Sequence, residues 1–82
     1  MIDIQLTNDS PTAARLQVRG RLTRETRAQF VQTILELVRR GSRRVSVDLR
    51  EVATLDTDGA QAIREASERL QAAGGALVLE ME

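Results

Sequence analysis

The sequence predicts an α/β domain of two layers, a mixed four-stranded sheet with both helices on one face. Three observations lead to this fold class. Residues 2–7, 13–20 and 43–50 alternate between apolar and polar side chains, as strands with one buried face do. Two longer segments repeat apolar residues at helical spacing. With a last apolar segment at 76–82, the element order is β-β-α-β-α-β.

The first two strands are predicted to form a hairpin. Residues 2–7 alternate strictly, and the polar segment 8–12, which contains the single proline, interrupts the pattern before residues 13–20 resume it. The inward faces would consist of Ile2, Ile4 and Leu6 in the first strand and of Ala14, Leu16 and Val18 in the second.

Residues 24–40 predict the first helix. Thr23 can cap its N-terminus, Arg39 and Arg40 lie in its last turn, and Gly41 follows its end. All three features favour the same helix. Its apolar stripe would be Phe30, Ile34, Leu37 and Val38.

The second half of the chain repeats the strand-helix-strand pattern. Residues 43–50 alternate as a strand, and the segment that follows them is expected to be its exit loop. A second helix then runs to the glycine pair at 74–75, and residues 76–82 form the last strand. The helical spacing is carried by Ile63, Ala66, Leu70 and Ala73.

The connections predict how the strands run. Each β-α-β unit should be a right-handed crossover between parallel strands, whereas the first strand runs antiparallel to the second. Because at least three strands alternate, one face of the sheet must be polar, so both helices should cover the other face. The open polar face is expected to carry Arg15, Gln17, Arg19, Ser46 and Asp48.

The composition excludes several classes of function. The chain has no cysteine and no histidine, which removes disulfides, thiolate nucleophiles and most zinc sites. Phe30 is the only aromatic residue, so a base-stacking platform for nucleic acid is not expected. No segment has the length of a membrane span or the pattern of a signal peptide. We therefore expect a cytoplasmic location without membrane insertion.

The charges are balanced overall but unevenly distributed. Twelve basic residues, all arginine, face twelve acidic ones. Residues 15–50 hold ten of the arginines, whereas residues 51–82 hold seven of the acids. This distribution is consistent with a solvated surface, or with two oppositely charged patches that dock a protein.

The segment LDTDG at residues 55–59 places polar groups where a strand passes into a helix. Asp56 or Thr57 can cap the helix, which is worth about 0.5–2 kcal/mol, and Asp58 can gain about 0.3–1 kcal/mol from the helix dipole. Alternatively, Asp48, Asp56 and Asp58 could converge as oxygen ligands for magnesium in a nucleotide-binding protein. Because alternation sends Asp48 to the open face, we predict no metal, no cofactor and no catalytic residue.

Residues 44–80, RVSVDLREVATLDTDGAQAIREASERLQAAGGALVLE, resemble the core of the STAS domain family of anti-sigma factor antagonists and their relatives. In that family a strand ending in aspartate and a hydrophobic residue, D-S-S-G or D-T-x-G, a helix and G-G recur in this order. Residues 18–30, VRGRLTRETRAQF, resemble its earlier segment. The resemblance implies a STAS-like sheet with helices on one side and a non-catalytic module that docks onto a protein.

The resemblance also implies the docking surface, which is the loop and helix start at residues 55–64. Asp56 would shape the loop, and Thr57 and Asp58 would present its polar tip. Gly59 would let the partner approach closely. The flanking contacts would be Ala60, Gln61 and Arg64.

Two branches of the family imply different partners. In transcription regulation, an unphosphorylated antagonist binds an anti-sigma factor kinase, and phosphorylation of the serine before the motif glycine ends binding. Asp58 occupies that position, so the switch is either fixed or was never used. Accessory STAS subunits of lipid-transport ABC systems instead carry D-T-x-G, with the threonine matching Thr57, and bind the ATPase subunit. Threonines here can be phosphorylated in stressosome relatives, so Thr57 is the candidate modification site.

The C-terminal strand carries a further expectation. Most family members continue past the fourth strand with another helix, so we expect residues 1–82 to be a single STAS-like domain that lacks it. Leu77, Leu79 and Met81 would then lie on a strand with an unpaired edge, open to a partner or to a homodimer. The acidic residues Glu80 and Glu82 would blunt that edge.

Overall fold

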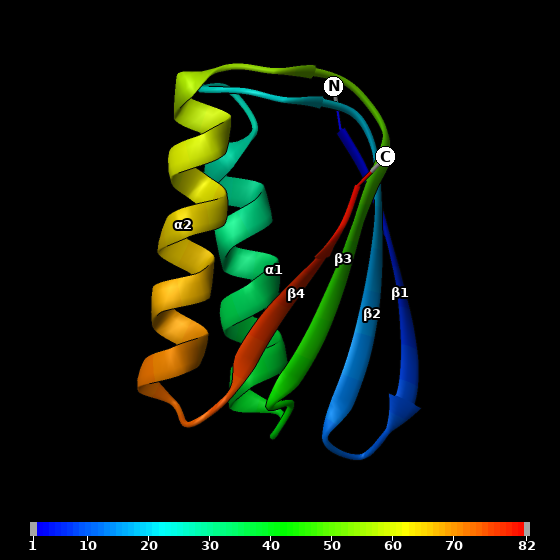
Figure 1. Ribbon diagram of the computed structural model, residues 1–82, viewed down its shortest axis with the longest axis vertical. Helices are drawn as coiled ribbons and strands as arrows, with labels where there is room; N and C mark the ends of the chain where they lie inside the picture. Colours follow the sequence, from blue (N-terminus) through cyan, green and yellow to red (C-terminus); the bar gives the residue numbers. More distant parts are fainter. Residues whose placement is uncertain (1, 82) are drawn as a thin grey trace.

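The computed structural model describes residues 2–81 and confirms the predicted element order and fold class (Figure 1). Four strands form one sheet, and two helices stand beside each other along it. The elements are β1 (Ile2–Ser10), β2 (Ala13–Leu22), α1 (Arg27–Arg39), β3 (Arg44–Leu55), α2 (Thr57–Ala72) and β4 (Ala76–Glu80).

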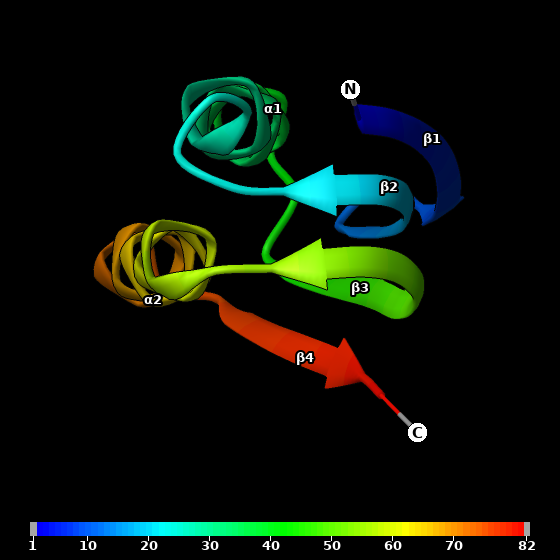
Figure 2. The ribbon, with the colours of Figure 1, turned by 90° about the horizontal axis from the view of Figure 1, so that it is seen from above.

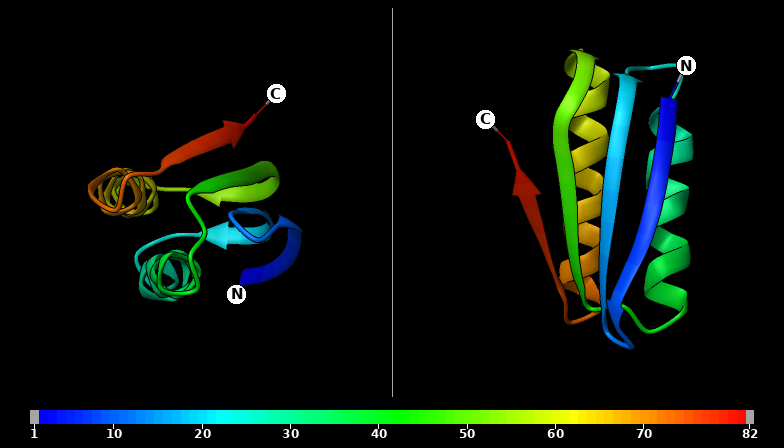
Figure 3. Two further views of the ribbon diagram at one scale, coloured as in Figure 1. Left: turned by 90° about the horizontal axis from the view of Figure 1, so that it is seen from below. Right: turned by 90° about the vertical axis from the view of Figure 1, so that its right-hand side faces the viewer.

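The sheet has the order β1-β2-β3-β4 and mixes both strand directions. β1 pairs antiparallel with β2, whereas β2, β3 and β4 are mutually parallel. Seen from above, both helices lie on the same side of the sheet (Figure 2). The views in Figure 3 show the opposite face without any covering element. The expectation of a sheet covered on one side is therefore confirmed.

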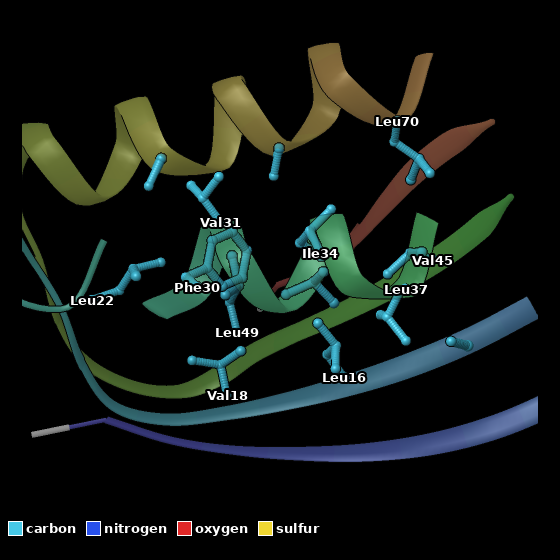
Figure 4. Packing of buried hydrophobic residues seen from close by; sticks show 14 residues of the cluster. Leu16, Val18, Leu22, Phe30, Val31, Ile34, Leu37, Val45, Leu49 and Leu70 are labelled. Atoms are coloured by element: carbon cyan, nitrogen blue, oxygen red, sulfur yellow. The ribbon is translucent and has the colours of Figure 1, made fainter. Parts of the chain in front are cut away.

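The core lies between the sheet and the helices, where the predicted alternation places apolar side chains (Figure 4). Phe30 is its largest fully buried side chain. Three of the four buried residues of α2 are small, namely Gly59, Ala62 and Ala66, and the fourth is Leu70. The buried apolar residues are Ala14, Leu16, Val18, Leu22, Phe30, Val31, Ile34, Leu37, Val45, Val47, Leu49, Ala62, Ala66 and Leu70.

The first helix begins later than the sequence predicts. Arg27 is its first residue, and Thr26 rather than Thr23 precedes it. The Thr23 carbonyl accepts hydrogen bonds from the amides of Thr26 and Arg27, which makes a turn before the helix. The buried Thr26 hydroxyl donates to the Arg21 carbonyl over 2.8 Å. Thr26 thus fastens this turn to the end of β2 and makes no side-chain cap bond to α1.

The third strand is longer than predicted. The expected exit loop after residue 50 is instead part of β3, which pairs with β2 as far as Leu55. Two register shifts in this pairing, after Gln17 and after Gly20, interrupt the regular alternation. Because such irregularities break the alternation of apolar and polar residues, a prediction from alternation alone does not detect this part of the strand. As a result only Asp56 separates the strand from α2.

Each helix is followed, after its C-cap residue, by a glycine with left-handed backbone geometry. Gly41 has φ of +99° and Gly74 has φ of +85°, a conformation that glycine adopts without steric cost. The amide after each glycine bonds back to the helix, from Ser42 to Leu37 and from Gly75 to Leu70. This pattern is the Schellman motif, so the glycines set where each helix returns to the sheet.

The open face carries the polar residues expected there. The register pairs Arg15 with Ser46 and Gln17 with Asp48, which places these side chains on the face away from the core. Asp48 is nevertheless only 3% exposed, because Arg15 and Arg50 lie over it.

Candidate functional site

The predicted site lies at one end of the molecule, where two connections meet. The junction of β3 with α2 and the turn between β2 and α1 run beside each other there (Figure 1). A hydrogen bond of 3.3 Å from the Arg24 amide to the Asp56 carboxylate links the two. The site is therefore assembled from segments about thirty residues apart in the chain.

Asp56 is the N-cap of α2. Its backbone is extended, and its carboxylate accepts a hydrogen bond from the Gly59 amide over 2.7 Å. This bond satisfies one of the amides that a helix start leaves without an intrahelical partner. Of the two capping residues that the sequence left open, the structure selects Asp56. Its carboxylate serves both the helix and the neighbouring turn, so it shapes the site internally.

Gly59 has a packing role inside the fold. It is buried, and a Cβ atom built on it would lie 2.0 Å from the Leu22 carbonyl oxygen and 2.9 Å from the Leu55 side chain. Its missing side chain therefore lets α2 pack against the end of β2. The sequence interpretation, in which Gly59 lets a partner approach closely, stays a prediction beside this packing role.

Asp58 is tied to the first helix. Its carboxylate accepts a hydrogen bond of 2.9 Å from the Arg27 guanidinium, which also lies 3.7 Å from Glu65. The three side chains are between 33% and 40% exposed. Sequence reasoning placed Asp58 at the polar tip but missed this pairing, because Arg27 is distant in the chain. The negative charge of Asp58 is thus balanced at close range.

A shallow groove of about 530 Å³ lies between α1 and α2 beside this ion pair. Arg27 and Asp58 line it together with Arg24, Val31 and Glu65. Four of the seven residues that line the groove are charged, namely Arg24, Arg27, Asp58 and Glu65.

The remaining predicted residues form one exposed face on the first two turns of α2. Thr57, Ala60, Gln61 and Arg64 are all exposed, and their spacing of three and four residues places them on one side of the helix. Their polar side chains make no hydrogen bond or ion pair with another residue of the described chain. Leu55 extends this face, since 44% of it is exposed. We refer to these five residues as the α2 face.

Leu55 is the apolar member that the sequence prediction did not single out. It ends β3 and lies beside Gly59 while part of it remains in contact with solvent. A leucine immediately before the capping aspartate was the available signal, because strand ends at helix starts are common places for binding residues.

The magnesium alternative lacks its ligand set. Asp48 lies on the open face, where it accepts hydrogen bonds from the backbone and the guanidinium of Arg50. Asp56 and Asp58 are engaged with the helix start and with Arg27. Within residues 2–81 no three acidic side chains gather closely enough to hold a metal ion.

The ionisation of Asp48 is strongly stabilised. The hydrogen bond from the Arg50 side chain, helped by that from its backbone, holds the pKa of Asp48 far below its usual range, although burial alone would raise it. Asp48 therefore stays charged at all physiological pH values and cannot act as a proton donor or acceptor there.

Neither helix in the described part of the chain has the length and apolar character needed to cross a membrane. The profile of a family described as "Mlab, STAS domain" matches residues 6–81. A comparison with curated proteins found no match.

Solved structures share the fold. The chain is similar to an antisigma-factor antagonist STAS domain from Rhodobacter sphaeroides, with a TM-score of 0.80 and 16% identity over 96% of this chain and 85% of that one. The chain is also similar to the anti-sigma factor antagonist SpoIIAA in its unphosphorylated form. The TM-score is 0.78 and the sequence identity is 17%, over 94% of this chain and 71% of that one. A third similar structure is Mglu, with a TM-score of 0.81 and a sequence identity of 24%. The match covers 93% of this chain but only 19% of that one.

Proposed function

Because the chain belongs to the STAS domain family, we propose that it is a non-catalytic protein-interaction module, similar to an anti-sigma factor antagonist, that docks a protein partner through the α2 face. One observation carries this proposal. Thr57, Gln61 and Arg64 are exposed, and their side chains have no polar partner within residues 2–81, while the neighbouring Asp56 and Asp58 are used within the fold. A face whose polar groups are available beside an exposed leucine suits recognition of another protein.

The position of the usual phosphoacceptor is occupied by the paired Asp58. Arg27 neutralises its charge at close range, so the surface around it resembles an unmodified site more than a phosphorylated one. We infer that this position does not switch in this chain and that docking is permanently permitted there. A serine at the same place would gain about −1.5 to −2 charges on phosphorylation, more than the single pair to Arg27 balances.

Thr57 remains the residue through which docking could be regulated. Its hydroxyl lies at the first position of α2, where a phosphate would be favoured by the helix dipole and would not disrupt the helix. The added charge would nevertheless change the α2 face at the start of the helix. Phosphorylation of Thr57 is therefore proposed to weaken docking without unfolding the domain.

The threonine also favours one alternative. The D-T-D-G segment follows the D-T-x-G pattern of accessory STAS subunits of lipid-transport ABC systems, and Thr57 is exposed as a contact residue must be. In that case the partner is an ABC ATPase subunit instead of an anti-sigma factor kinase. Both partners would use the same face, so the identity of the bound protein separates the two.

The proposal is tested by affinity capture with the full chain as bait in an extract of the source organism, followed by mass spectrometry. Arg64→Glu and Thr57→Arg alter the α2 face, and Arg39→Glu, which reverses a 77% exposed side chain at the far end of α1, is the matched control. We expect one protein to be retained by the natural chain and by Arg39→Glu but lost with both face variants. If both face variants still retained the same protein, docking through the α2 face would be refuted.

The retained protein then assigns the branch. An ATP-binding kinase of the anti-sigma type supports the antagonist role, and an ABC ATPase with its permease supports the transport role. Differential scanning fluorimetry with magnesium and ATP tests the remaining alternative. A rise in Tm that Asp56→Asn abolishes would point to nucleotide binding, against the module.

A further inference from the structure

The outer edge of β4 is unpaired in the described chain. β4 ends the strand order, and no element lies beyond it in the two views of Figure 3. The strand carries no charge between Ala76 and Leu79, and Val78 and Leu79 are 46% and 40% exposed. Natural proteins usually protect such an edge with lysine, proline or a covering segment. Residues 76–79 contain neither lysine nor proline, and no described element covers the edge.

We propose that a second copy of this chain pairs with this edge, so that two β4 strands run antiparallel about a two-fold axis at Val78. The two sheets would then form one continuous sheet of eight strands. This register places Val78 opposite Val78 of the second copy on the open face. It also places Leu79 opposite Leu77 of the second copy on the helix side, since both residues pair with core residues of β3. Each exposed apolar side chain thereby gains an apolar cross-strand neighbour.

Charge complementarity supports this register. It sets Ala76 opposite Glu80 of the second copy, and Ala76 lies beside Arg44 in β3. Arg44 is exposed, and its guanidinium makes no ion pair with any residue of the described chain. It would reach Glu80 of the second copy across the small Ala76, a span of two strands or about 9–10 Å.

The same span is already bridged within one chain. Arg15 in β2 lies 3.1 Å from Glu80 in β4, although the whole of β3 separates the two strands. An arginine and a glutamate can therefore meet over an intervening strand on this face. In the paired sheet, Glu80 would lie between Arg15 of its own chain and Arg44 of the other, with one carboxylate serving both.

The other edge of the sheet opposes self-pairing. β1 carries Asp3 and Asp9, and a register that sets the exposed Leu6 opposite itself would place Asp3 opposite Asp9 of the second copy. Like charges directly opposite each other destabilise a strand pair. The β1–β2 ladder is also irregular between Asn8 and Ser10. Of the two edges, β4 is thus the one whose side chains complement a second copy.

Sedimentation equilibrium of the purified chain tests the association. We expect a reversible dimer, with a dissociation constant that Val78→Lys raises about tenfold or more, because two ammonium groups would meet on the axis. Leu6→Lys is the matched control, since Leu6 is 40% exposed on the opposite edge. Arg44→Glu should weaken the dimer, whereas Arg21→Glu, at the other end of the sheet, should not. A natural chain that stays monomeric at millimolar concentration overturns the proposal.

Cysteine cross-linking tests the register, because the chain contains no cysteine of its own. Val78→Cys should form a disulfide-linked dimer under mild oxidation, since the two Cβ atoms would be about 4.5–5.5 Å apart. Ala76→Cys lies on the same strand and face, but its copies would be about 13 Å apart and should stay unlinked. Equal cross-linking of the two variants would mean random collision and would overturn the pairing. Neither experiment involves the α2 face.

Discussion

The guanidinium of Arg27 donates a 2.9 Å hydrogen bond to the carboxylate of Asp58, which joins the first turn of α1 to the first turn of α2. Asp58 compensates for the unfavourable position of Arg27. The positive charge of an arginine in the first turn of a helix interacts unfavourably with the helix dipole. The negative charge of the aspartate in the first turn of α2 interacts favourably with it. The pair therefore orients the two helix starts that carry the candidate site.

We expect this pair to contribute measurable coupling to stability. Both side chains are more than 30% exposed, so the coupling should lie at about 0.2–1 kcal/mol. Urea unfolding of Arg27→Gln, Asp58→Asn and the double variant measures it as a double-mutant cycle. Losses that simply add would show that the contact has no energetic role.

The cap of α2 should depend on an oxygen at residue 56. Asp56→Ala is expected to lower the free energy of unfolding by about 0.5–2 kcal/mol, because the Gly59 amide loses its acceptor. Asp56→Ser supplies a hydroxyl oxygen and should keep most of the stability. Chemical denaturation compares the two. Equal losses in both variants would contradict the capping role.

A methyl group at Gly59 should reverse the usual effect of alanine in a helix. Glycine to alanine normally stabilises a helix by about 0.5–1 kcal/mol. Here the added Cβ meets the Leu22 carbonyl, so Gly59→Ala should instead destabilise the fold by about 1–3 kcal/mol. Ala60→Gly, at the next and exposed position, is the control and should cost about 0.5–1 kcal/mol. A stabilised Gly59→Ala would disprove the contact.

Asp48 should make stability depend on acid pH. Its pKa is depressed in the folded state by Arg50, so its contribution is complete above the unfolded value of about 3.9 and is lost as pH falls below it. Asp48→Asn should therefore lower Tm at neutral pH, and the difference from the natural chain should shrink as pH falls from about 5 to about 2.

The control for this titration is Asp9→Asn. Asp9 is exposed, and its side chain makes no hydrogen bond or ion pair within residues 2–81. This variant removes a carboxylate without removing a contact, so it should change Tm at neutral pH far less than Asp48→Asn does. If the Tm difference of Asp48→Asn were independent of pH, its cause would be packing and not charge.

Local patterns in the sequence determined the architecture of this protein. Period two in the strands, helical spacing in the helices and the glycines at 41 and 74 depend on neighbours within a few residues. These features can therefore be recognised in the sequence alone. The same logic identified residues 56–59 as the start of α2 and predicted an open polar face.

Contacts between distant segments were decided only by the tertiary structure. The late start of α1 depends on Thr26 reaching the end of β2, and the length of β3 depends on irregular pairing with β2. The roles of Gly59 and Asp58 were set by Leu22 and Arg27, each more than thirty residues earlier in the chain. No periodicity encodes such pairs, because steric fit and charge pairing act through space and leave no trace in sequence spacing.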